Sequence, residues 1–288
     1  MSNQSESRLS RRGFIGVAGG ALASGTLAAA LGAPGAASAQ SLPAPGRWPL
    51  PVLDPNAVRD NGYWGYWAND PFKNTNYGCS YGVASALLAE IKAKLGPGSP
   101  WDLLPLEMFK WGKTGAVESG TLCGALCGAL PIFSLAAPDC ITEMGADLIR
   151  WYQEAPLPSM EMDNLDSKRR YPGQAQSVSA SPLCHVSVTE WCKASGKLSG
   201  STDRKTRCGK LTGDVGKMAA IILNRLVPGQ KYVPIYGAQP ELYADCVHCH
   251  IDAPPPPTPT DVRLNDSLGI TNCKTCHPDS VPVYSPTK

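Results

Sequence analysis

The chain has 288 residues, 17% of them charged, and a formal net charge of +2. This length is enough for one or two domains with a buried core, and 27 prolines with 29 glycines indicate many loops. The near-neutral charge and the lack of a basic cluster exclude nucleic acid as an expected partner.

Residues 1–39 have the pattern of a twin-arginine export signal. Arg11 and Arg12 precede an apolar stretch rich in Gly and Ala, and the small residues 37–39 precede Gln40 as a signal peptidase requires. We therefore expect a periplasmic mature chain that begins near Gln40 and has no membrane span after signal cleavage. The alternative is an uncleaved membrane anchor, since the apolar run is almost long enough to span a bilayer.

A proline-rich N-terminal arm, residues 40–60, is expected to lead into a helical body, residues 61–239. The start of the body, residues 61–78, is aromatic and Gly-rich without a helical period, so we expect an ordered loop there. Apolar residues at helical spacing, ended by Gly or Pro, predict helices within 79–98, 118–137, 139–156, 182–195 and 205–229. No run of alternating residues indicates strands, so the expected fold class is all-α.

Small residues are dense in the second of these helices. Gly120, Gly124 and Gly128 recur every four residues, and Cys123 and Cys127 are one turn apart. If all five lie on a helix, the glycines let another backbone approach closely, as tight packing or a buried cofactor requires.

Residues 240–288 are expected to form an irregular, proline-rich segment, and they carry two copies of the pattern Cys-x-x-Cys-His. The copies are Cys246, Cys249 and His250, and Cys273, Cys276 and His277. Two thiols at this spacing can form thioethers with the vinyl groups of one haem, and the adjacent His is then placed beneath the iron. A four-cysteine zinc ribbon is the competing interpretation, but it gives no reason for a His after each pair. A thioredoxin-like motif would need a βαβ context. We therefore predict two haem c groups.

The chain has only four histidines. If His250 and His277 are the proximal ligands, His185 and His248 remain as the second axial ligands of two bis-histidine irons. His248 lies inside its own motif, so it would serve the other haem or a partner subunit; otherwise it is a solvent-exposed loop residue. For His185 the alternative is a hydrogen-bonded core imidazole.

The helical body also carries cysteines that are candidate ligands of an iron–sulfur cluster, a 2Fe–2S or another type. These are Cys79, Cys123, Cys184, Cys192 and Cys208. Thiolates on helices of one small body suit such a cluster, and a twin-arginine signal favours a cofactor acquired before export. Inert buried thiols or disulfides are the alternative in an oxidising compartment.

Four stretches, YGCSYGVASALL, GTLCGALCGA, SPLCHVSVTEWC and RCGKLTGDVGKMAAIILN, resemble the split-Soret cytochrome c family. The body of that family resembles the wider C_GCAxxG_C_C group of redox-active proteins, and the resemblance covers about residues 60 to 288. It implies a homodimer with two closely packed bis-histidine haems per subunit and an iron–sulfur centre in the body. The group's cysteines fall on Cys79, Cys123, Cys208 and one of Cys184 and Cys192. Here the first motif reads GCSYG, without Ala after the Cys.

The expected function is electron transfer with a redox protein as donor or acceptor, without catalytic residues. With every histidine used as an iron ligand, neither an open coordination position nor a histidine base remains for small-molecule chemistry. One alternative is a haem-dependent oxidoreductase that acts on a small sulfur or nitrogen compound at one open haem. Another is a non-haem metal-binding protein.

Overall fold

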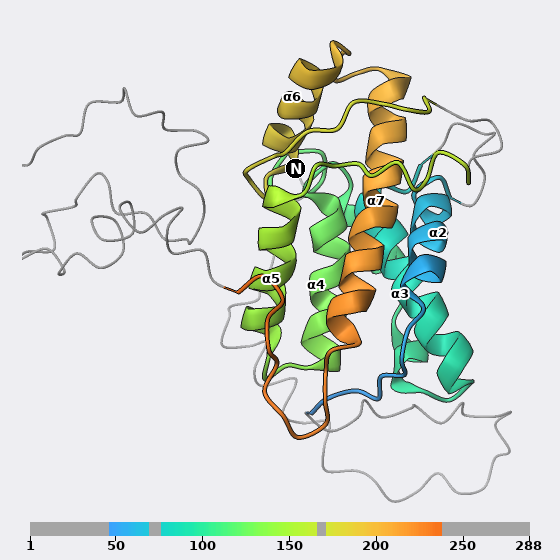
Figure 1. Ribbon diagram of the computed structural model, residues 1–288. Coiled ribbons are helices and arrows are strands. Elements are labelled where there is room, and N and C mark those ends of the chain that lie inside the picture. Colours follow the sequence, from blue (N-terminus) through green and yellow to red (C-terminus); the bar gives the residue numbers. More distant parts are fainter. Residues whose placement is uncertain (1–45, 69–75, 166–170, 238–288) are drawn as a thin grey trace, which may run out of the picture. The chain divides into compact units, whose positions relative to one another are not determined.

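The computed structural model describes residues 46–68, 76–165 and 171–237 (Figure 1). The expected signal peptide and the 240–288 segment lie outside the described residues. Both Cys-x-x-Cys-His motifs and His248 therefore lie outside them too.

The described residues form an all-α body, as the sequence predicts, with isolated bridges in place of strands. The α-helices are α2 (Pro55–Tyr66), α3 (Cys79–Leu95), α4 (Gly124–Ala136), α5 (Ile141–Glu154), α6 (Cys184–Ser195) and α7 (Thr202–Leu223). Two 3-10 helices, η2 (Pro100–Leu103) and η3 (Leu106–Gly112), join α3 to the loop before α4. None of the helices in these ranges combines the length and apolar character that a bilayer span needs.

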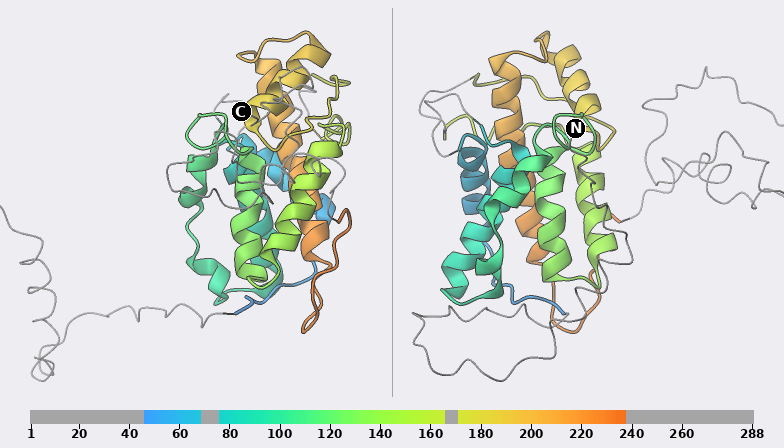
Figure 2. Two further views of the ribbon diagram at one scale, coloured as in Figure 1. Left: turned by 90° about the vertical axis from the view of Figure 1, so that its left-hand side faces the viewer. Right: turned by 180° about the vertical axis from the view of Figure 1, so that it is seen from behind.

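Helix α7 is the central element of the body and packs against α2, α3, α4 and α5. Figure 2 shows the same bundle from the side and from behind, with α6 at one end of it. The bundle packs tightly because small residues lie where helices meet: a Cβ on Gly213 would lie 2.8 Å from the carbonyl oxygen of Arg59 on α2. Buried aromatic and aliphatic side chains, such as Tyr63, Leu87 and Phe133, fill the rest of the core.

The loop predicted at residues 61–78 is wrong over its first part, because α2 extends to Tyr66. The helix also crosses residue 60, the expected end of the N-terminal arm. Asp54 caps this helix by accepting from the backbone N–H of Asn56, and Pro55 starts it. Gly62 and Gly65 suggested a loop, but in the structure both are buried and let α2 lie close to α7 and α3.

The helix predicted within 118–137 begins only at Gly124, so Gly120 lies in the preceding loop and Cys123 is the N-cap. The close approach expected at the glycines is confirmed for Gly124 and Gly128. A Cβ on either would collide with a backbone oxygen, of Gly112 and Ser80 respectively. The other predicted helices are confirmed, and α7 begins three residues earlier than the predicted start.

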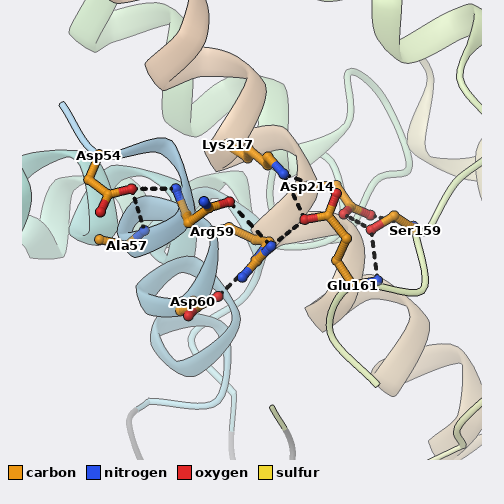
Figure 3. Close-up of polar contacts among 9 residues, drawn as sticks. Asp54, Ala57, Arg59, Asp60, Ser159, Glu161, Asp214 and Lys217 are labelled. Atoms are coloured by element: carbon orange, nitrogen blue, oxygen red, sulfur yellow. Dashed lines mark hydrogen bonds and ion pairs between the residues drawn. The ribbon is translucent and has the colours of Figure 1, made fainter. Parts of the chain in front are cut away.

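A polar network joins α2, α7 and the segment after α5 (Figure 3). Glu161 accepts from Lys217 of α7 at 2.7 Å and pairs with Arg59 of α2. Asp214 of α7 is buried and accepts from the backbone N–H of Ser159 at 2.7 Å and from its hydroxyl at 2.5 Å. These contacts hold the chain that leads towards α6 against the middle of the bundle.

Candidate metal centre

Four buried thiols meet at the end of the bundle where α3, α4 and α6 begin. Cys79 is the first residue of α3, Cys123 is the N-cap of α4, Cys184 is the first residue of α6, and Cys208 lies in the second turn of α7. Each is at most 7% exposed. Residues from four separate stretches of the chain thus supply one thiol each.

Local backbone contacts explain how two of these thiols come together. Leu122 and Leu183 form an isolated antiparallel bridge, in which the N–H of Cys123 donates to Pro182 and the N–H of Cys184 donates to Thr121 at 2.7 Å. On the other side, a Cβ on Gly124 would lie 3.3 Å from the Cβ of Cys79. A glycine at the start of α4 is therefore what lets α3 bring its first residue this close.

The four thiols interact electrostatically with one another. The Cys79 thiol donates a hydrogen bond to the sulfur of Cys208, which raises the pKa of Cys79 well above its usual value. The same hydrogen bond lowers the pKa of Cys208, and the charges of Arg207 and Arg204 lower it further against the effect of burial. Burial, then the neighbouring Cys123 and Cys208, raises the pKa of Cys184. Among the four thiols, Cys208 is thus the one whose deprotonation its surroundings favour.

Positive charge surrounds the thiols on two sides. Cys79, Cys123 and Cys184 lie at helix N-termini, where backbone N–H groups and the helix dipole favour anionic sulfur. Arg207 is 2% exposed, and its Nη1 lies 4.0 Å from the sulfur of Cys208. The arrangement suits a group that carries several negative charges.

The thiols are neighbours but do not yet form a finished ligand set. Within the described ranges, no three His, Cys, Asp or Glu side chains converge closely enough to hold a metal ion as they stand. The seven cysteines of these ranges are all free, so the structure gives no support there to the disulfide alternative.

An iron–sulfur cluster nevertheless fits these residues by their chemistry. Four thiols are buried together, and the guanidinium of Arg207 lies among them with its Nε lacking any hydrogen-bond acceptor. A buried cation in that position would be compensated by thiolates and inorganic sulfide, which are the components of such a cluster. The sequence does not single out Arg207 for a role, although Arg207 is the first residue of the stretch RCGKLTGDVGKMAAIILN.

The structure distinguishes Cys184 from Cys192, between which the sequence left the choice open. Cys192 is half-buried and lies eight residues further along α6, about 12 Å at the helical rise. Cys184 is the one that lies beside Cys123 and Cys208. Cys127, one turn into α4, is also buried near Cys123, and burial raises its pKa to about 11.

His185 follows Cys184 directly but is exposed, so the alternative of a core imidazole is wrong. Its Nδ1 lies 2.9 Å from the carbonyl oxygen of Gly120. A carbonyl can only accept, so this nitrogen carries the proton, and in the neutral tautomer the lone pair is on Nε2. That arrangement is common for histidines that bind metals through Nε2.

A strained loop holds His185 in this position. Residues 114–118 all have positive φ, from 46° to 70°, although Thr114 and Val117 are β-branched. Left-handed backbone at such residues costs energy and concentrates at functional sites. The loop and α6 line a cavity of about 440 Å³, which includes Cys184, His185 and Arg204 in its wall. The cavity therefore has the exposed His185 and one of the four thiols, Cys184, in the same wall.

Comparisons with known proteins show the family of the chain. A model of the family described as "Putative redox-active protein (C_GCAxxG_C_C)" matches residues 77–222, a range that contains all four buried thiols. The split-Soret cytochrome c of Desulfovibrio desulfuricans is 30% identical in an alignment of 284 positions, which covers 93% of this chain and 94% of that protein.

A solved structure is similar as well. That structure is of the split-Soret cytochrome c from Desulfovibrio desulfuricans ATCC 27774, with what is described as a novel iron centre. The two structures superpose with a TM-score of 0.68 at 29% identity, covering 81% of this chain and 91% of the other.

Proposed function

The chain belongs to the split-Soret cytochrome c family, and on that premise we propose that it is a periplasmic electron-transfer protein with two c-type haems and an iron–sulfur centre. The observation that carries the proposal is the set of four buried thiols beside an otherwise uncompensated arginine. Because the chain belongs to a cytochrome family, we infer a redox role for this site.

Cys79, Cys123, Cys184 and Cys208 are the proposed cluster ligands, and Cys192 is not. When bound, the cluster and the haems supply one-electron redox chemistry. The chain's own contribution is to exclude water from the thiols, to place three helix N-termini and Arg207 beside them, and to hold the His185 ring by its Nδ1.

The haems are assigned to the C-terminal segment. Cys246 and Cys249 would anchor one and Cys273 and Cys276 the other, with His250 and His277 as proximal ligands. His185 and His248 would complete the two irons. The exposure of His185 and the Nδ1 contact to Gly120 support this role, because in the neutral ring that contact puts the lone pair on Nε2.

The export signal supports a periplasmic location, and the family supports a homodimer that exchanges electrons with another redox protein. A folded cluster-containing body is a suitable cargo for the twin-arginine route, since such a cofactor is inserted before export. The histidine count again favours electron carriage over catalysis: two haems with bis-histidine ligation use all four.

A second candidate is an oxidoreductase for a small sulfur or nitrogen compound. The cavity of about 440 Å³ beside His185 favours it, because a small molecule could enter there if His185 did not ligate an iron. A carbon monoxide difference spectrum of the reduced protein separates the two. Electron transfer with two six-coordinate haems predicts almost no response, whereas one open haem predicts about one carbon monoxide bound per chain.

A further inference from the structure

Arg207 is a buried cation whose hydrogen bonds are only partly satisfied. Its Nη2 donates to the hydroxyl of Ser187 at 2.7 Å and lies 3.4 Å from the Ser187 carbonyl oxygen. Its Nη1 reaches the sulfur of Cys208 at 4.0 Å, and its Nε has no acceptor. Within the described part of the chain, no carboxylate pairs with this guanidinium.

The same helix contains a buried cation that is compensated in the ordinary way. Lys210, three residues further along α7, is fully buried and pairs with Asp163 at 2.5 Å while donating to the carbonyl oxygen of Tyr171 at 2.9 Å. A cation in a protein interior needs such a counter-charge, because the loss of hydration is otherwise not recovered. Arg207 lacks one, so its counter-charge must be something other than a carboxylate.

A second buried donor lies in the same place. Tyr152 of α5 is fully buried, and its hydroxyl has no hydrogen-bond partner of normal geometry, although it lies beside Cys123. Ser187 of α6 is near both the Tyr152 hydroxyl and the guanidinium. Unsatisfied donors from α5 and α7 thus converge on the side of the thiols formed by Cys123 and Cys208.

We propose that Arg207, assisted by the Tyr152 hydroxyl, is the positioning residue that sets the charge balance and the reduction potential of the iron–sulfur centre. Its free Nε–H and the Tyr152 O–H would donate to thiolate or sulfide sulfur of the centre. The inference rests on the proposed function, since it needs a cluster at the four thiols, but it goes beyond it by assigning a role to two residues that are not ligands.

The expected effect on potential follows from charge. An electron delivered by the partner redox protein makes the centre one unit more negative, and a fixed cation in a low-dielectric interior stabilises that reduced state more than the oxidised one. Hydrogen bonds to the sulfurs act in the same direction. Arg207 therefore raises the potential, and its removal lowers it.

The test uses the full-length exported protein and the variants Arg207→Gln and Arg207→Lys. Lys205→Gln is the matched control, because it removes one positive charge from a partly exposed position of the same helix. Iron, acid-labile sulfide and haem are measured first in the wild type. Iron in excess of haem, with sulfide, is required by both the proposed function and this inference, and its absence overturns both before any variant is needed.

The potential of the cluster is then followed by a redox titration monitored by electron paramagnetic resonance. Arg207→Gln should shift it to a more negative value at unchanged iron and sulfide content, Arg207→Lys should shift it less, and Lys205→Gln should leave it unchanged. A cluster in Arg207→Gln with the wild-type potential overturns the inference and leaves the proposed function standing.

A second readout covers a variant that loses its cluster. Iron is stripped from wild type and Arg207→Gln with a chelator, which leaves covalently attached haem in place, and thermal unfolding is compared. Without a cluster only the Cys208 sulfur remains as a possible counter-charge, so the Arg207→Gln change should lower the melting temperature less in the stripped protein than in the loaded protein, and the variant should lose iron faster to the chelator. An equal loss of melting temperature in the stripped and loaded proteins would mean that Arg207 serves packing in the core, which overturns the inference.

Discussion

Replacing Asp214 by Asn should make the protein more stable at neutral pH and remove part of its pH dependence. The Asp214 carboxyl is 5% exposed, and burial raises its pKa from 3.8 to about 6, although both hydrogen bonds from Ser159 oppose the rise. Because the folded state binds the proton more tightly than the unfolded state, the stability from this group is complete below about pH 4. It is lost as the pH rises through 6.

The size of the effect follows from the same values. At about 1.4 kcal/mol per pKa unit, the rise corresponds to about 3 kcal/mol of unfolding free energy lost between pH 4 and pH 7. Asn keeps an oxygen for the Ser159 N–H and avoids the buried charge. Asp214→Asn should therefore match the wild type near pH 4 and exceed it by up to about 3 kcal/mol at pH 8.

Urea unfolding at several pH values, followed by circular dichroism, measures this difference. Glu161→Gln is the control of opposite sign, because the hydrogen bond from Lys217 lowers the pKa of Glu161 and its contribution is lost as the pH falls. If Asp214→Asn were less stable than the wild type at pH 8, the carboxylate would stabilise the fold, and the reasoning from its burial would be refuted.

Three further changes test the site. Cys184→Ser should remove the iron and sulfide in excess of haem, whereas Cys192→Ser should keep both; loss in the second variant alone would reverse the ligand assignment. His185→Ala should leave the melting temperature nearly unchanged, since the side chain is exposed, but should produce a high-spin haem that binds carbon monoxide. An unchanged low-spin spectrum would exclude His185 as a ligand. Gly120→Ala should lower the unfolding free energy by about 1–2 kcal/mol, because φ is +75° and the new Cβ would lie 3.2 Å from the Cβ of His185. No loss in urea unfolding would contradict the loop geometry.

Helices with a clear apolar period and a Gly or Pro at the end could be predicted from the sequence, as α3 and α5 were. Helix α2 could not, because its glycines and aromatics resemble a loop until the neighbouring helices that bury them are known. The predicted start of α4 is too early, because it depends on tertiary contacts as well. The left-handed turn at residues 114–118 and the Leu122–Leu183 bridge, which fix where α4 begins, depend on contacts with α6 that local sequence does not encode.

The residues of the candidate site also divide into those that the sequence predicts and those that only the fold identifies. The candidate cysteines could be named from their types and positions, but only the fold shows that Cys184, and not Cys192, lies beside Cys123 and Cys208. The sequence pattern gave no indication that Arg207 is buried, because an arginine near the start of a long helix is usually solvent-exposed. Its burial without a carboxylate is a property of the packed bundle alone.

The most direct test of the account is the stoichiometry of haem, iron and acid-labile sulfide in the purified mature protein. Two covalently bound haems per chain, with iron in excess of haem and sulfide to accompany it, are predicted. A colourless protein, or iron equal to haem without sulfide, would contradict the account, the first for the C-terminal segment and the second for the four buried thiols.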